Sequence, residues 1–258
     1  MKPLFPALAL VLLLAPAARA DMSWELKTET TLSLGKEKRA LPVSTESFAL
    51  KANVLRIDAA NNPTMFLNAA NGTVIFVDYP SSAFLLTEFT EVVATRDRER
   101  EEMSSRLDRL EAALEQYQGA DREVQRAMIA AQRKKYELWA RPYTVLPTGE
   151  RRKIDGHPCL KYEGRAGGEV FQEIWAAEDI VLDPAYLALH AGRLAQLDPQ
   201  RFSHLGRVRG FPLLVVSRYG AVTVTDTLSR FTPAAIPPDA FIIPAGFRET
   251  AAAFKRQR

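Results

Sequence analysis

The first part of the chain alternates apolar and polar residues with the period of two that is typical of half-buried strands. Between residues 24 and 34, Trp24, Leu26 and Thr28 alternate with charged residues, which predicts a strand over this segment. The segment from Gly35 to Ser44 is rich in charge and contains Pro42, so we expect a loop there.

The next apolar segment runs from Phe48 to Ile57 and predicts a second strand. Phe48, Leu50 and Val54 occupy alternate positions and are expected to share one face. Leu55 and Ile57 follow in the opposite phase, which favours a β-bulge near Val54.

Three shorter strands are predicted after this one, at 64–68, 73–78 and 84–89. Asn71-Gly72 is a strong hairpin signal between the first two of them, and a turn at 79–82 joins the last two. The five strands together predict an antiparallel meander with one apolar face.

The pattern changes to a helical period between residues 91 and 140, where the chain has no proline and one glycine, Gly119. Apolar residues are spaced four, three, four and three apart, which indicates a heptad seam typical of a coiled coil. The seam consists of Met103, Leu107, Leu110, Leu114, Tyr117, Val124, Met128, Ala131 and Leu138. We expect a long helix or a helical hairpin bent at Gly119, forming an arm or lid separable from the sheet.

The rest of the chain returns to strands. Turn signals at Thr148-Gly149 and Gly156-His157-Pro158 predict a tight hairpin, with strands ending at Ile154 and running from Cys159 to Glu163. Further strands are expected at 169–176, 211–218 and 221–228. A helix is expected to begin at Asp183-Pro184 and to end at Asp198-Pro199, and an apolar end at 241–247 is expected to dock on the sheet.

The first twenty residues have the features of a cleaved export signal. Lys2 precedes an apolar run from Leu4 to Ala15 that is too short to span a bilayer, and Ala18-Arg19-Ala20 is a small-x-small cleavage site. The alternative is an N-terminal membrane anchor. Export predicts a periplasmic or secreted protein that begins at Asp21, with one domain over residues 21–250, a helical insertion at about 91–140 and a basic tail at 251–258.

Charge and cysteine content exclude some functional classes. The chain has 34 basic and 31 acidic residues, a net charge of +3, and loss of two basic residues with the signal leaves 3 − 2 = +1. Basic residues are not arranged in a stripe with interleaved aromatics, so we expect no nucleic-acid partner. Cys159 is the only cysteine, which rules out an intramolecular disulfide.

The sequence contains no recognisable catalytic motif. His157, His190 and His204 lack the spacing of a local metal site, and phosphate loops and nucleophile elbows are absent. We therefore expect a protein that is not an enzyme and uses no cofactor or metal. The candidate residues for a binding cavity or core are large and apolar: Trp24, Phe48, Leu50, Val54, Phe76, Phe84, Trp175 and Phe211.

Four short motifs, in order, resemble an uncharacterised bacterial envelope family, the domain-of-unknown-function family forty-four twelve. They are Thr148-Gly149-Glu150 with Ile154-Asp155-Gly156-His157-Pro158-Cys159 and Tyr162, Glu173-Ile174-Trp175-Ala176, Gly210-Phe211-Pro212-Leu213, and Pro244-Ala245-Gly246-Phe247. The helical insertion before the first motif is also similar. One departure is His157, which stands where the family usually has an aromatic residue.

The resemblance implies an α+β fold related to periplasmic lipoprotein carriers, with helices over the concave face of a curved antiparallel sheet, an unclosed β-barrel. It implies no catalytic residues. Two functions are considered. The one-faced sheet with its helical cover, together with the resemblance, favours binding of a lipid or acyl chain in a half-barrel cavity. The heptad seam from Met103 to Leu138 favours binding of an envelope protein partner through the charged helical arm.

Overall fold

The computed structural model describes residues 21–181, 187 and 191–250. The predicted signal (1–20), the basic tail (251–258) and the predicted helix start at Asp183-Pro184 lie outside the described residues. The described strands are β1 (Met22–Leu34), β2 (Glu37–Ala40), β3 (Ser44–Lys51), β4 (Val54–Ala59), β5 (Thr64–Asn68), β6 (Thr73–Asp78), β7 (Ala83–Glu88), β8 (Tyr143–Ile154), β9 (His157–Ala166), β10 (Glu169–Ala177), β11 (Phe211–Tyr219), β12 (Val222–Thr232) and β13 (Arg248–Glu249). The described helices are α1 (Phe89–Ala112), α2 (Gly119–Trp139), α4 (Gly192–Leu197) and α5 (Pro199–Phe202), with 3₁₀ turns η1 (Ala113–Gln116) and η3 (Pro238–Phe241).

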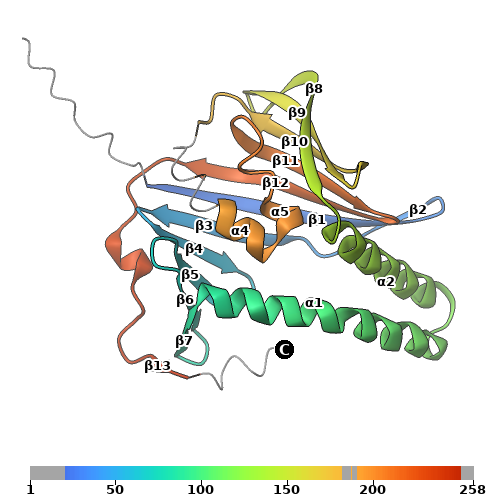
Figure 1. Ribbon diagram of the computed structural model, residues 1–258, viewed down its shortest axis with the longest axis horizontal. Coiled ribbons are helices and arrows are strands. Elements are labelled where there is room, and N and C mark those ends of the chain that lie inside the picture. The colour runs from blue at the N-terminus through green and yellow to red at the C-terminus, as the bar shows by residue number, and fades with distance from the viewer. Residues whose placement is uncertain (1–20, 182–186, 188–190, 251–258) are drawn as a thin grey trace, which may run out of the picture.

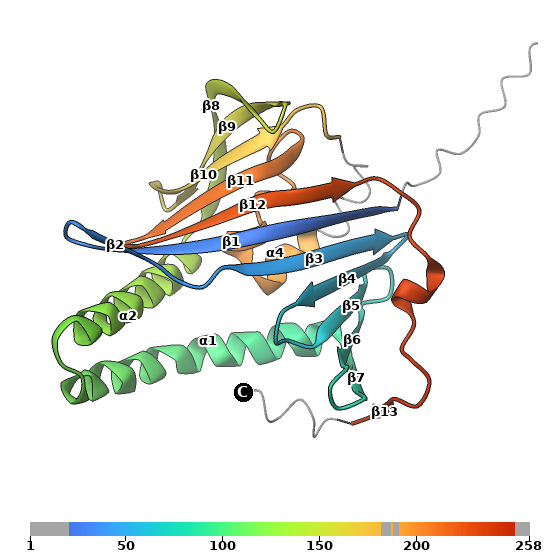
Figure 2. The same ribbon diagram turned by 180° about the vertical axis from the view of Figure 1, so that it is seen from behind.

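All the described strands belong to one sheet, whose order is β13-β7-β6-β5-β4-β3-β1-β12-β11-β10-β9-β8, with β2 paired to β1. Neighbouring strands are antiparallel except β13 and β7, which are parallel. The sheet curves strongly and its two edges, β13 and β8, do not meet (Figures 1 and 2). The predicted class, an α+β fold with a curved, unclosed antiparallel sheet and helices over its concave face, is confirmed.

Strand β1 runs through the middle of the sheet and sets its apolar face. Trp24 lies opposite Phe48 of β3 and Phe231 of β12, so the large side chains at alternate positions of three strands meet on the concave side. Each such side chain contributes about 1.5–3 kcal/mol when it is fully buried. The main apolar cluster consists of Met22, Trp24, Phe48, Leu50, Leu55, Leu67, Val74, Phe89, Cys159, Trp175, Ala177, Ile180, Leu194, Phe211, Leu213 and Leu228.

The predicted strand from Phe48 to Ile57 is wrong, because the chain reverses direction within it. β3 ends at Lys51, Ala52 has a positive φ of 50°, and Lys51 pairs with Val54 at the start of β4. The change of phase after Val54 is therefore a two-residue hairpin turn and not a bulge. The turn contains no glycine, so the alternation of apolar and polar residues does not distinguish it from a continuous strand.

The predicted loop from Gly35 to Ser44 is also partly wrong. Residues 37–40 form β2, which folds back on the end of β1 and pairs Leu34 with Glu37. Gly35 has a φ of 60°, which suits a tight hairpin turn. The charged side chains of β2 are exposed on a hairpin that projects beyond the sheet (Figure 1).

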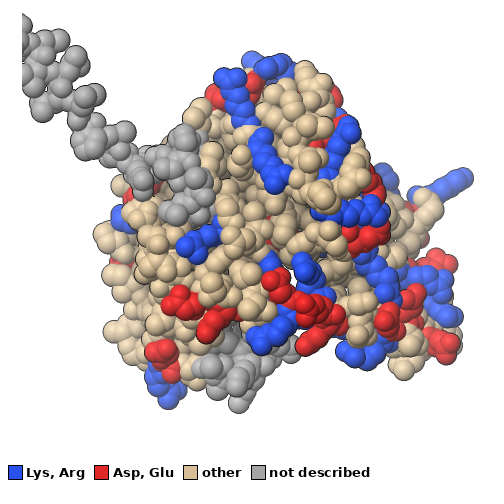
Figure 3. Space-filling view, in the orientation of Figure 1, with Lys and Arg blue, Asp and Glu red and all other residues tan. Residues whose placement is uncertain are grey.

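The insertion between β7 and β8 is a helical hairpin, as one of the two predicted alternatives proposed. α1 and α2 are joined through η1, and Gly119, with a φ of 57°, begins α2. Charged side chains of both signs cover its outer surface (Figure 3). No helix in the described part of the chain is both long and apolar enough to cross a membrane.

The apolar seam of the arm divides between two contacts. Leu107 of α1 and Leu114 of η1 pack against Ile129 of α2, with Met103 and Tyr136 beside them. On another side of α2, Ala131 and Leu138 pack on the sheet in a second apolar cluster completed by Leu32, Ala166, Phe171, Tyr219 and Val222. The C-terminal half of α2 is therefore part of the core, and only the tip of the arm is separate from the sheet.

The hairpin predicted around Gly156 is confirmed, with one correction. Asp155 and Gly156, both with positive φ, form the turn between β8 and β9. Thr148-Gly149 is not a turn but an irregularity inside β8, where the register shifts between Pro147 and Arg151. The helix predicted to end at Asp198-Pro199 does end there, since α4 stops at Leu197. Asp198 then caps a further helix, α5, by accepting a hydrogen bond from the Arg201 amide.

The C-terminal segment covers the convex face at the β4–β7 end, as its apolar content predicted. The ring of Phe241 lies 6.4 Å from Phe66, and the ring of Phe247 lies 5.7 Å from Tyr79. Arg56 donates a hydrogen bond of 2.7 Å to the Ala240 carbonyl. β13 then pairs alongside β7 and covers that edge of the sheet.

Candidate binding site

Three hollows follow β1 along the concave face. The first, of about 570 Å³, lies at Met22; the second, of about 40 Å³, lies at Trp24 and Leu26; the third, of about 340 Å³, lies at Thr28 and Thr30. Because alternate residues of a strand point to the same side, these five residues form one inward stripe. The stripe changes from apolar to polar between Leu26 and Thr28.

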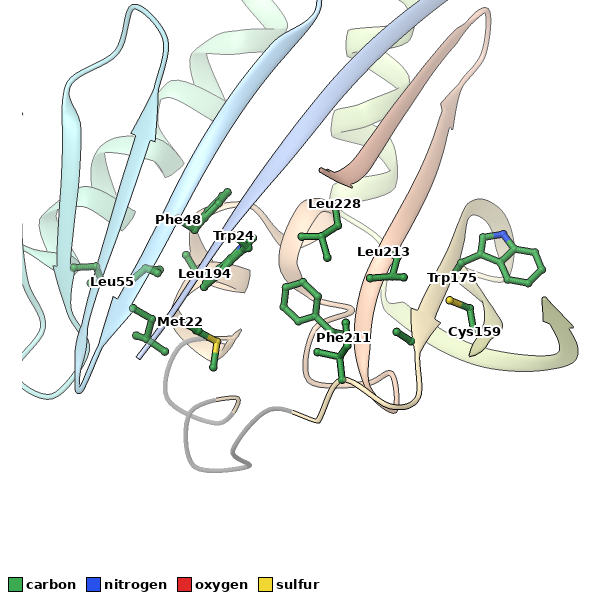
Figure 4. Close-up of a cluster of buried hydrophobic side chains, with 14 of the residues drawn as sticks. Met22, Trp24, Phe48, Leu55, Cys159, Trp175, Leu194, Phe211, Leu213 and Leu228 are labelled. Atoms are coloured by element: carbon green, nitrogen blue, oxygen red, sulfur yellow. The ribbon is translucent and has the colours of Figure 1, made fainter. Parts of the chain in front are cut away.

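The second hollow, which we call the apolar cavity, lies between the sheet and the helices α4 and α5. Trp24 stacks on Phe48 with ring centroids 5.0 Å apart and meets Phe211 edge-on at 5.9 Å. Leu194 of α4 packs over them, as Figure 4 shows. The lining includes Trp24, Leu26, Ala191, Leu194, Phe202, Leu205, Phe211 and Val215, with Arg201, His204 and Asp226 as its polar members.

The third hollow, which we call the polar cleft, lies between the sheet, α5 and α2. Its charged lining residues are Glu46, Lys135, Asp198, Arg201 and Asp226. Arg201 forms an ion pair with Glu46, and Lys135 lies 3.5 Å from Asp198. Arg201 and Asp226 line both hollows, so the apolar cavity and the polar cleft adjoin at these two residues.

Asp226 sits on the inward face of β12, opposite Thr28 of β1. The Thr28 hydroxyl donates a hydrogen bond of 2.5 Å to Asp226 Oδ1. Burial raises the pKa of Asp226, while the positive charge of Arg201 and the Thr28 hydrogen bond act in the opposite direction. Asp226 is thus a carboxylate held at the boundary between apolar and polar surroundings.

A chain of hydrogen bonds positions α5 over the sheet. Tyr143 donates to Gln172 Oε1 at 2.7 Å, and Gln172 Nε2 donates to Ser217 Oγ at 2.9 Å and to the Gln200 carbonyl at 2.7 Å. Gln200 Nε2 donates in turn to the Lys135 carbonyl of α2 at 2.7 Å. These bonds tie α5 to both β10 and α2, so Arg201 is held between the apolar cavity and the polar cleft.

His204 is the buried histidine of the described chain, with an exposed fraction of 4%. It lines the apolar cavity, and its Nδ1 has no hydrogen-bond partner among the described residues. Burial, with a contribution from the positive charge of Arg201, lowers the pKa of His204 to about 4. The imidazole is therefore neutral near pH 7.

The structure brings most of the eight predicted cavity residues together. Those that belong to the main apolar cluster are Trp24, Phe48, Leu50, Trp175 and Phe211, and Phe76 packs against it. Of these, Trp24 and Phe211 line the apolar cavity. That they bind a ligand remains a prediction.

Two predicted cavity residues, Val54 and Phe84, lie on the opposite face. The hairpin turn after Lys51 places Val54 out of phase with Leu50, and Leu55 takes the inward position instead. Phe84 pairs with Val77, whereas Phe76, the inward residue of β6, pairs with Leu85. Both errors arise because the alternation of apolar and polar residues does not determine where a strand begins, and so which of its residues face inward.

Trp175 is buried but lies away from Trp24 and Phe48, beside Cys159 (Figure 4). The guanidinium of Arg152 lies 3.9 Å from its ring centroid and the Lys161 ammonium 5.6 Å. These contacts are cation–π interactions that cover the indole, so Trp175 supports the β8–β10 region and not the cavity.

The described residues contain no group of three or more histidine, cysteine, aspartate or glutamate side chains that could hold a metal ion. His157 Nδ1 lies 3.0 Å from Asp179 on the surface, and His190 lies outside the described residues. Burial raises the pKa of the Cys159 thiol, which disfavours the reactive thiolate. The absence of enzymatic activity remains a prediction.

The polar lining was missed from the sequence. Thr28, Glu46 and Asp226 alternate with other polar residues, so the pattern gives no sign that they face inward. Arg201 follows a helix-breaking Asp-Pro and resembles an ordinary surface residue. The one usable signal was that Thr28 continues the phase of Trp24 and Leu26.

No family model and no curated protein matches the chain. Among solved structures, PNGF-II aligns with a TM-score of 0.38 and 12% identity, covering 92% of this chain and 32% of PNGF-II. This chain thus spans about a third of the length of PNGF-II. LprF from Mycobacterium bovis aligns with a TM-score of 0.27 and 13% identity, covering 86% of this chain and 90% of LprF. Both similarities are weak, and function has to be inferred from the residues of this chain.

Proposed function

We propose that this chain is an exported, non-enzymatic protein that binds an apolar or amphipathic ligand, such as a lipid or acyl chain, on the concave face of its sheet. The observation that supports this most directly is the junction at Arg201 and Asp226, where the apolar cavity adjoins the polar cleft. Binding sites for small molecules are usually apolar hollows with a few polar groups that fix orientation. An amphiphile has the same division between apolar and polar ends.

The length of the inward stripe fits an extended chain. From Met22 to Thr28 the strand advances about 20 Å at about 3.3 Å per residue. The apolar cavity of about 40 Å³ is large enough for water but too small for a long chain. A bound chain therefore requires α4 and α5, which are six and four residues long, to shift outward from the sheet.

The proposed compartment is the bacterial envelope. It rests on the signal features of residues 1–20 and on the resemblance of the motifs between Thr148 and Phe247 to an envelope family, whose implied relation to lipoprotein carriers agrees with a lipid ligand. Removal of the signal after Ala20 leaves Asp21 at the N-terminus. Asp21 accepts hydrogen bonds from the Lys51 ammonium at 3.0 Å and from the Ile236 amide at 2.9 Å, so this residue has a defined place in the fold.

The proposal is tested by extracting the purified mature protein and identifying co-purified lipids by mass spectrometry. In parallel, the protein is titrated with an apolar dye whose fluorescence rises on binding. Val215→Phe, which fills the apolar cavity, should abolish dye binding, whereas Val216→Phe on the neighbouring outward position should preserve it. Thermal unfolding of each variant controls for a folding defect. Absence of both lipid and dye binding in the unmodified protein contradicts the proposal.

A second candidate function is binding of an envelope protein partner through the helical arm. The observation that favours it is the exposure of Leu110 and Tyr117 at the far end of the arm, among charged residues. Aromatic and aliphatic side chains surrounded by polar residues are common at protein interfaces. Crosslinking in cells through a photoreactive residue at position 110 tests this function, with position 36 on the β2 hairpin as the control.

A further inference from the structure

The polar cleft carries more negative than positive charge. Its lining contains three carboxylates, Glu46, Asp198 and Asp226, and two cations, Lys135 and Arg201. The two cations are already engaged, Arg201 with Glu46 and Lys135 with Asp198. Asp226 has no ion-pair partner among the described residues, and the hydrogen bond that it accepts comes from the neutral Thr28 hydroxyl. The cleft lining therefore has one more carboxylate than it has cations, and Arg201, which also acts on Asp226, is shared with Glu46.

The cleft also contains a buried acceptor that lacks a donor. Gln200 has an exposed fraction of 3%, and its Nε2 donates to the Lys135 carbonyl. Because a carbonyl can only accept, this bond fixes which end of the amide is nitrogen. Gln200 Oε1 is left without a hydrogen-bond partner in the described part of the chain. Buried acceptors in this state are unfavourable and are normally satisfied by water or a ligand.

Both features require the same kind of partner. An excess of one carboxylate favours a positive charge, and an unsatisfied amide oxygen favours a hydrogen-bond donor. An ammonium group supplies one charge and several N–H donors and has no acceptor of its own. A carboxylate or phosphate head group would be repelled by Asp226 and would have to displace Glu46 from Arg201.

We propose that the polar cleft binds the ammonium head of an alkylamine-type amphiphile at Asp226, with its apolar chain in the adjoining apolar cavity. Asp226 lines both hollows, so an ammonium paired with it places the first methylene groups next to Leu26 and Val215. This inference rests on the proposed function, because the same cavity must accept the chain. It adds the charge and the hydrogen-bonding class of the ligand.

The test uses three probes with the same chain length and different heads: octylamine, octanoate and 1-octanol. Isothermal titration calorimetry of the mature protein at pH 7 should show octylammonium binding at least tenfold more tightly than octanoate. Asp226→Asn keeps an acceptor for Thr28 but removes the charge, and it should reduce octylammonium affinity about tenfold with octanol binding unchanged. Glu29→Gln is the matched control, since Glu29 is an exposed carboxylate next to Thr28 on the outward face of β1.

A second variant tests the charge of the cleft through the anionic probe. Glu46→Gln releases Arg201 and makes the charge of the cleft lining balanced, so octanoate should gain affinity relative to octylammonium. This variant provides an independent answer if Asp226→Asn fails to fold.

The outcomes separate the two proposals. If all three probes bind the unmodified protein equally, or octanoate binds most tightly, the ammonium assignment is wrong and ligand binding in the cavity stands. The ammonium assignment is also wrong if neither Asp226→Asn nor Glu46→Gln changes the order of affinities. If no probe binds the unmodified protein, the proposed function fails and the ammonium assignment fails with it.

Discussion

The indole ring of Trp24 lies parallel to the phenyl ring of Phe48, with centroids 5.0 Å apart and an angle of 2° between the ring planes. The two residues face each other across β1 and β3, which makes this stack the floor of the concave face. Phe48→Ala should lower the free energy of unfolding by about 3–5 kcal/mol, because it removes a buried aromatic ring and leaves a cavity. Urea denaturation followed by circular dichroism measures this.

Phe84→Ala is the comparison for this variant. Phe84 is half-buried on the outward face and lies outside the main apolar cluster, so its loss should be less damaging than the loss of Phe48. Equal destabilisation by the two substitutions would show that the convex covering contributes as much as the concave core.

The two ends of the helical arm should respond differently to a buried charge. Leu138 of α2 is 2% exposed and packs on the sheet, whereas Leu110 of α1 is 46% exposed. Leu138→Asp should destabilise the whole protein by at least about 3 kcal/mol, because a carboxylate would lie in the core without a partner. Leu110→Asp should change the stability by no more than about 0.5 kcal/mol. Thermal unfolding of both variants measures this difference. A greater loss of stability in Leu110→Asp than in Leu138→Asp would mean that the packing of α2 on the sheet does not stabilise the protein.

His204 should make the protein sensitive to mild acid. Its pKa is lowered to about 4 from an ordinary value of 6.5, so the unfolded chain binds more protons than the folded one between these values. The stabilising contribution is complete above pH 6.5 and is lost as the pH falls toward 4, by about 3 kcal/mol in total. His204→Phe should flatten this part of the curve of unfolding free energy against pH. Parallel curves for the two proteins between pH 4 and 6.5 would rule out His204 as the source.

Gly210 is a position where any side chain conflicts with the backbone. Its φ is 91°, and a Cβ atom placed there would lie 1.9 Å from the Ala177 carbonyl oxygen. Gly210→Ala should therefore destabilise the protein by several kcal/mol or prevent folding. Gly192→Ala is the matched control, because it lies in α4 with open space around it and should be neutral or stabilising by up to about 1 kcal/mol. Soluble yield and melting temperature provide the comparison.

Cys159 should be chemically inert in the folded protein. It is 1% exposed, and burial raises the pKa of its thiol. A thiol reagent should modify it only after addition of denaturant, and Cys159→Ala should leave ligand binding intact at a cost of about 1–2 kcal/mol in stability. Rapid labelling in native buffer would contradict this placement.

The sequence predicted the sheet and its covering helices but not the division of the concave face. Strong alternation and heptad spacing located β1, β5, β6 and the helical hairpin, because these patterns follow from local geometry. The turn after Lys51 was missed because its residue with positive φ is Ala52, and an alanine does not signal a turn as a glycine would. The inward direction of Asp226 depends on pairing with Thr28, 198 residues away, which local patterns cannot reveal.

The pairing of β1 with β12 also determines when the sheet can be completed during synthesis of the chain. β3 follows β1 closely, so one edge of β1 is covered early, but its other edge pairs with residues 222–232. A growing chain therefore has a central strand that is paired along one edge only until nearly all of it has been made. Such contacts between distant segments form slowly and expose strand edges to aggregation. If the chain is exported as proposed, this late pairing of β1 with β12 would leave the sheet open while the chain is transported.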